Sequence, residues 1–244
     1  MSRVYIIMFS AFLVTKVIFA VVSLLMGIKV RKTMAREAGS SLGLGIILLS
    51  IAFLFNALLD SRMINPVIVR SFNGSNAEAY ATVILVMSYL RLIPRILNLA
   101  GWYFIADYCG RKYGSHIKIP VLVIPVLRDL IYHASVLIFK GESVLVKIPA
   151  CTALLNITFS VAALSVFTVT FFRNREKEDT FRFLYVIFIV LIAGEIFANL
   201  LLLISAFCPE IVVYLADLAV AAIPLVLPVY AFICAGNTKV TATE

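Results

Sequence analysis

The chain alternates between long apolar stretches and short polar connections. Seven apolar stretches can be marked, and each approaches the ~20 residues that an α-helix needs to cross the hydrocarbon core of a bilayer. The pattern therefore predicts an all-α, polytopic integral membrane protein, a bundle of seven transmembrane helices that forms a single domain over residues 1–244. The stretches cover residues 4–29, 40–60, 79–107, 119–139, 148–172, 181–208 and 211–236.

The composition supports the same class. Hydrophobic residues make up 63% of the chain and charged residues 14%, whereas a soluble domain has about 45–50% apolar and about 25% charged residues. The formal net charge of +8 would suggest a nucleic-acid partner in a soluble protein. Here the basic residues gather in short connections, which is typical of membrane orientation and of contact with anionic lipids. The expected partner is the lipid bilayer, with no nucleic acid.

The basic residues are distributed unequally between alternate connections. Because cytoplasmic loops carry the excess of Lys and Arg, the richer side is predicted to be cytoplasmic, with the N-terminus outside and the C-terminus inside. The richer side has Lys29, Arg31, Lys32, Arg36, Arg111, Lys112, Lys118, Arg173, Arg175, Lys177, Arg182 and Lys239, and the other side has Arg3, Arg62, Arg70, Lys140 and Lys147.

A set of charged residues lies deep inside the apolar stretches. A charge at that depth costs several kcal/mol unless it is paired, so such residues are candidates for function. Most of them fall near the midpoint of a stretch, which predicts that they share one layer of the membrane. The candidate ligand- or ion-binding residues are Lys16, Arg91, Arg95, Arg128, Asp129, Glu195 and Asp217.

Helical spacing predicts how these side chains are directed. Arg91 and Arg95 are four residues apart and share one helical face, so they require nearby anions, either carboxylates or a bound anion. Arg128 and Asp129 point about 100° apart, which favours partners on different helices. Pro94 removes one helical hydrogen bond and kinks its helix. Such an interruption beside charges marks a binding site in transporters, and is a structural feature in other membrane helices.

Two interpretations of the charged layer remain open. One is an internally paired ion network that fixes the register of the helices. The other is a binding site, and the formal excess of one positive charge in the layer favours a small anion or a protonatable solute over a cation. The leading hypothesis is a small membrane transporter or channel. The alternatives are a seven-helix receptor or sensor that signals to a cytoplasmic partner, and a structural subunit or assembly factor of a membrane complex.

Other chemistries are not indicated by the sequence. No catalytic motif is found, so no enzymatic activity is expected, and the last stretch has no lysine that could form a retinal Schiff base. With four cysteines, two histidines and no Cys-x-x-Cys pair, neither a metal site nor a cofactor is expected.

Two covalent features stay open. Asn73-Gly74-Ser75 matches the glycosylation pattern in an outer connection, and the alternative is a chance tripeptide in a turn. Cys151 and Cys208 both fall toward the outer face, where a disulfide would form, and the alternative is a pair of ordinary apolar thiols.

Overall fold

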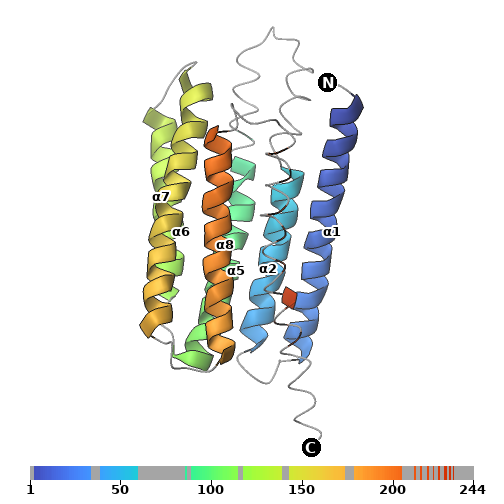
Figure 1. The fold of residues 1–244 in the computed structure, drawn as a ribbon, viewed down its shortest axis with the longest axis vertical. Coiled ribbons are helices and arrows are strands. Elements are labelled where there is room, and N and C mark those ends of the chain that lie inside the picture. Colours follow the sequence, from blue (N-terminus) through green and yellow to red (C-terminus); the bar gives the residue numbers. More distant parts are fainter. Residues whose placement is uncertain are drawn as a thin grey trace, which may run out of the picture. The chain divides into compact units, whose positions relative to one another are not determined.

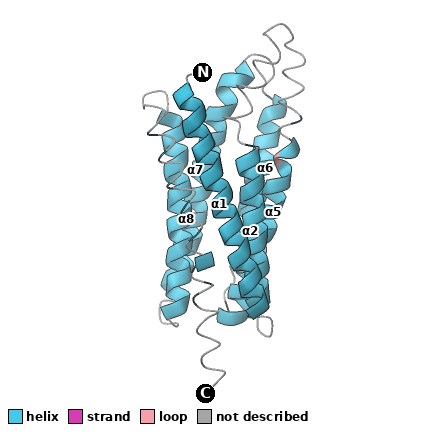
Figure 2. Cartoon of the chain, turned by 90° about the vertical axis from the view of Figure 1, so that its right-hand side faces the viewer, coloured by secondary structure: helices cyan, strands magenta, loops and turns pink. Residues whose placement is uncertain are grey.

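The computed structural model describes most of the predicted helical regions. It covers residues 3–33, 39–59, 89–114, 118–138, 143–173 and 179–204, with single positions at 86 and between 212 and 233. Within these ranges every assigned element is a helix and no strand occurs (Figure 2). The prediction of an all-α chain is confirmed for this part of the protein.

The six helices with defined bounds correspond to six of the predicted stretches (Figure 1). The agreement is closest for the fourth stretch, whereas α5 ends later than the third stretch was expected to end. Most of the third stretch before α5 lies outside the described residues, and Val86, Tyr89 and Leu90 are helical there. For the seventh stretch no helix bounds fall within the described residues. The helices are α1 (Arg3–Thr33), α2 (Gly39–Leu58), α5 (Leu92–Tyr113), α6 (Lys118–Ile138), α7 (Ser143–Arg173) and α8 (Asp179–Ile204).

The chain divides into two compact units. The first comprises Met1–Ile105 and Cys234–Glu244, and the second comprises Ala106–Ile233. In the first unit α1 packs along α2, and in the second α6 packs on α7 and α7 packs on α8. Helix α5 contributes its first part to one unit and its last turns to the other. The two units are described separately below.

Two of the described helical segments, Ser10–Thr33 and Ser40–Leu58, are long and apolar enough to cross a membrane. Shorter apolar segments occupy Leu154–Thr170 in α7 and Ile189–Leu201 in α8. Large apolar side chains on α1 are also exposed, among them Ile7 at 69% and Leu25 at 61%. Lipid would cover such side chains without the cost that water imposes. Membrane association is supported by these two segments, and the count of seven spans stays a prediction.

Small residues allow α1 and α2 to approach closely. A Cβ atom added to Gly27 would lie 2.9 Å from the side chain of Ile46, and one added to Gly43 would lie 2.5 Å from the backbone of Arg31. Ser50 also donates a 2.7 Å hydrogen bond to the hydroxyl of Ser23 across the pair. Close backbone approach at small residues and hydrogen bonds between helices are the usual stabilising contacts of membrane helices.

Helices α2 and α5 meet at a second pair of glycines within the first unit. A Cβ atom on Gly45 would lie 2.7 Å from the side chain of Ile105 and 2.8 Å from the carbonyl oxygen of Gly101. A Cβ atom on Gly101 would lie 2.8 Å from the side chain of Leu49. Neither glycine therefore has room for a methyl group unless the helices separate.

We expect Gly45→Ala to lower the free energy of unfolding by about 1–3 kcal/mol, because the new methyl group overpacks the contact with Ile105 and Gly101. Denaturant titration in detergent micelles measures this change. Leu58→Ala on the same helix is the control, since Leu58 is 53% exposed and its truncation should change little. Equal stability of the two variants would contradict the close α2–α5 contact.

Candidate functional site

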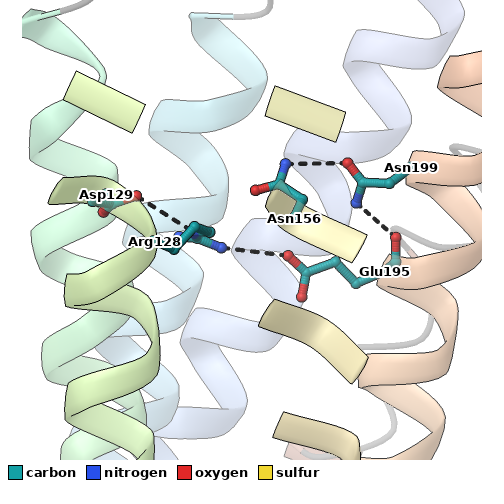
Figure 3. A network of polar contacts seen from close by, with 5 residues as sticks. All are labelled: Arg128, Asp129, Asn156, Glu195 and Asn199. Atoms are coloured by element: carbon teal, nitrogen blue, oxygen red, sulfur yellow. Dashed lines mark hydrogen bonds and ion pairs between the residues drawn. The ribbon is translucent and has the colours of Figure 1, made fainter. Parts of the chain in front are cut away.

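The second unit contains an ion network centred on Arg128, in the middle of α6. The Nε atom of Arg128 lies 3.3 Å from Oδ1 of Asp129, and its Nη1 atom lies 3.6 Å from Oε1 of Glu195 on α8 (Figure 3). Pro125 lies inside α6, within one turn of this arginine. One guanidinium therefore has two carboxylate partners, one on its own helix and one on another.

Neutral polar groups extend this network to α7. Asn156 on α7 donates a 3.1 Å hydrogen bond to the side-chain oxygen of Asn199 on α8. Asn199 in turn donates a 2.8 Å bond to the backbone carbonyl of Glu195 (Figure 3). Ser160, a buried residue one turn after Asn156, provides a further hydrogen bond to the carboxylate of Glu195. We refer to these residues as the polar cluster, which consists of Arg128, Asp129, Asn156, Ser160, Glu195 and Asn199.

The exposure of the charged groups is graded across the cluster. The side chains of Arg128 and Asp129 are 25% and 26% exposed, whereas the side chain of Glu195 is 49% exposed. Arg128 is thus enclosed between its partners, and Glu195 retains an accessible side. With one cation and two carboxylates, the cluster has a formal excess of one negative charge when all three groups are ionised.

The cluster differs from the expectation in one respect. Arg128 and Asp129 were expected to contact different helices, but they bind each other, because the flexible guanidinium can fold back toward the neighbouring carboxylate. Arg128 also reaches another helix, as expected, through Glu195. The predicted excess of one positive charge counts all seven residues of the layer, one of which lies outside the described residues, so it stays a prediction.

Lys16, another predicted site residue, belongs to the first unit. Its side chain is buried within α1, with 8% of the residue exposed, and its Nζ atom lies 5.1 Å from the ring centroid of Phe12. A lysine ammonium at this distance from an aromatic face is attracted by the ring quadrupole. The structure therefore gives Lys16 a stabilising aromatic contact one helical turn away.

Arg91 and Arg95 flank the start of α5 in the first unit. Tyr89 and Leu90 are helical, Arg91 lies in a turn, and α5 begins at Leu92. The predicted interruption therefore occurs three residues before Pro94, whose side chain is fully buried. Proline removes the hydrogen bond to the carbonyl four residues earlier, which accounts for the break. Arg95 is half-buried, and its Nη1 atom is shielded from solvent.

Several predicted features lie outside the described residues. Asp217, the remaining predicted site residue, is one of them, and so are the glycosylation motif at Asn73 and the cysteine Cys208. The predicted charged layer, the glycan and the Cys151–Cys208 disulfide therefore stay predictions. In the part that is described, Cys109 is a buried free thiol.

Three members of the polar cluster were not among the predicted residues. Asn156, Ser160 and Asn199 are uncharged, and the stretch around the first two has no charge at all. A sequence signal nevertheless existed, because Asn156 and Ser160 are four residues apart, as are Glu195 and Asn199. Each pair therefore forms a polar patch on one face of an apolar helix.

Within the described ranges, no three His, Cys, Asp or Glu side chains lie close enough to hold a metal ion. The sequence matches no protein-family model, no curated protein and no solved structure. The chemistry of the polar cluster is therefore the basis for assigning a function.

We expect Arg128→Met to destabilise the protein more than Glu195→Gln. Loss of the arginine leaves two nearby carboxylates without their common cation, whereas loss of the Glu195 charge leaves Arg128 paired with Asp129. The partial exposure of both groups reduces the effect, so a double-mutant cycle should give a coupling energy of about 1 kcal/mol. The measurement is denaturant titration in micelles. A larger cost for Glu195→Gln would contradict the shared pairing.

A second cycle tests the amide contact between α7 and α8. We expect Asn156→Ala and Asn199→Ala to be coupled by about 0.6 kcal/mol, the average for hydrogen bonds between membrane helices. Thr158→Ala is the control on α7, because the hydroxyl of Thr158 bonds only locally to the carbonyl of Leu154. If Thr158→Ala and Asn199→Ala showed an equally large coupling energy, the double-mutant cycle would not be measuring the hydrogen bond between Asn156 and Asn199.

Proposed function

We propose that the chain is a small multi-pass membrane transporter that moves a protonatable solute, with the polar cluster as its binding site. The observation that carries the proposal is Glu195. Its carboxylate is bound by Arg128 on one side, and its side chain is 49% exposed in the middle of an apolar helix. A carboxylate with these properties can exchange an internal partner for a proton or a bound solute.

The membrane topology in this proposal is the seven-span bundle with the N-terminus outside. Helices α7 and α8 have 31 and 26 residues, which correspond to about 46 Å and 39 Å at 1.5 Å per residue. Both exceed the ~30 Å hydrocarbon core of a bilayer. The basic residues in the last turns of α1, α5 and α7 support a common cytoplasmic end for these helices.

The charge of the polar cluster supports a protonatable or cationic solute over a small anion. An anion would approach two carboxylates and one arginine, and like charges in a medium of low dielectric constant repel strongly. A solute with an ammonium group, or a proton, would instead compete with Arg128 for Glu195. Asn156, Asn199 and Ser160 add donors and acceptors that suit a polar solute.

A structural role is the second candidate, and it has its own support. Arg128 joins α6 to α8, and the amide pair joins α7 to α8, so the cluster fixes the rotation of three helices. In that case the only role of the cluster would be to fix the relative positions of the helices, as in a subunit of a larger membrane complex. The two candidates differ in whether Glu195 exchanges its partner.

The test is solute-driven proton movement in proteoliposomes that contain a pH-sensitive dye. Methylammonium, acetate and chloride serve as probes of three charge classes. We expect the wild type to respond to methylammonium more than to chloride, and Glu195→Gln to reduce that response by at least ~10-fold, the effect of about 1.4 kcal/mol in binding. Arg173→Gln is the control, because it removes an exposed charge at the end of α7.

Three outcomes would contradict the transporter proposal. One is a wild type that moves protons with none of the probes, and another is a Glu195→Gln variant that retains the full response. A chloride response that exceeds the methylammonium response would contradict the solute class. Inactivity of the wild type, combined with a loss of stability in Glu195→Gln, would favour the structural network.

A further inference from the structure

A second charged cluster lies where α5 ends and α6 begins, within the second unit. Asp107 is buried, with 7% of its side chain exposed, and Arg111 places its Nη2 atom 2.7 Å from Oδ2 of that carboxylate. Lys118, at the start of α6, forms an ion pair with the other oxygen. A single buried carboxylate therefore holds one cation from each of two helices. We call Asp107, Arg111, Lys112 and Lys118 the turn cluster.

The connection between the helices keeps these groups together. Gly114 has a φ of 67°, a left-handed conformation that glycine adopts without strain, and its N–H donates a 3.0 Å bond to the carbonyl of Gly110. The helix therefore stops at Tyr113, and the next helix begins at Lys118. Four residues connect the helices, so the two cations remain near each other.

The cations of the turn cluster contact the buried carboxylate and also remain accessible at the surface. Arg111 is 63% exposed and Lys118 is 39% exposed, although both contact the buried carboxylate. Lys112 is also exposed, and its Nζ atom lies 5.7 Å from the ring centroid of Tyr108. With three cations and one carboxylate, the cluster has a formal excess of two positive charges. Its outward N–H groups can donate to an anion.

The expected depth of the turn cluster in the membrane indicates which class of anion it would bind. The third predicted span ends at residue 107 and the fourth begins at residue 119, so the turn cluster lies at the level of the lipid headgroups on the cytoplasmic side. This placement rests on the membrane topology proposed above and not on transport activity. Anionic phospholipids are concentrated in the cytoplasmic leaflet, and arginine binds phosphate through two parallel N–H groups.

We propose that the turn between α5 and α6 binds the phosphate of one anionic phospholipid headgroup. Arg111, Lys112 and Lys118 donate to the phosphate, and Asp107 positions Arg111 and Lys118. The neutral Tyr108 ring supports Lys112 on the adjacent face of α5. The site is separate in sequence and in chemistry from the polar cluster, so a lipid can bind there whether or not the protein transports a solute.

The experiment uses the purified full-length protein in a neutral detergent. Phosphatidylglycerol, phosphatidylcholine and soluble glycerol 3-phosphate are titrated separately, and the rise of the unfolding temperature gives an apparent Kd. We expect saturable stabilisation by phosphatidylglycerol alone. Lys112→Gln and Arg111→Gln should each weaken it about 5-fold, the effect of about 1 kcal/mol per basic residue near an anionic surface.

Two controls make the result decisive. Lys112→Gln leaves both ion pairs of Asp107 intact, so it tests the site even if Arg111→Gln impairs folding. Arg173→Gln removes an exposed arginine from the same expected side of the membrane and should not change the apparent Kd. Equal stabilisation by both lipids, an equal loss in Arg173→Gln, or full reproduction of the effect by glycerol 3-phosphate would each overturn the lipid site.

Discussion

A charged arginine in an apolar helix requires an anionic partner, and the arrangement of the second unit depends on this requirement. Arg128 satisfies it by reaching from α6 to Glu195 on α8. Separating this partly exposed ion pair would cost about 1 kcal/mol, which opposes independent rotation or sliding of the two helices. The amide bond between Asn156 and Asn199 then fixes α7 against α8. A few polar groups thereby link the helices α6, α7 and α8 to one another.

The positions of the helices could be predicted from sequence, because apolar runs of this length, separated by short polar connections, favour helices. The stretch 119–139 differs by one residue at each end from α6 (Lys118–Ile138). Helix ends were harder to predict. Helix α5 continues past the apolar stretch to Tyr113, since Arg111 and Lys112 are good helix formers and Gly114 provides the stop. Hydropathy locates the helix, and backbone chemistry locates its end.

The candidate site could be predicted only in part. The charges inside the apolar stretches were evident because their burial is costly, and three of them, Arg128, Asp129 and Glu195, do meet. Their pairing was not evident, because contacts between helices depend on rotation about each axis, and the apolar residues of α8 mark no single face of that helix. The uncharged Asn156 and Asn199 were not predicted, because an asparagine costs little free energy in an apolar helix. Such residues are therefore common there and do not stand out in a sequence.

The neighbouring position of Asp129 has a consequence for synthesis. Glu195 is made roughly 70 residues after Arg128, an interval on the order of 3–14 s at ~5–20 residues per second. During that time α6 has left the ribosome and α8 does not yet exist. Asp129, the next residue in the chain, is available to Arg128 from the start. Arg128 and Asp129 can thus pair within the nascent α6, and the contact with α8 is added when Glu195 is made.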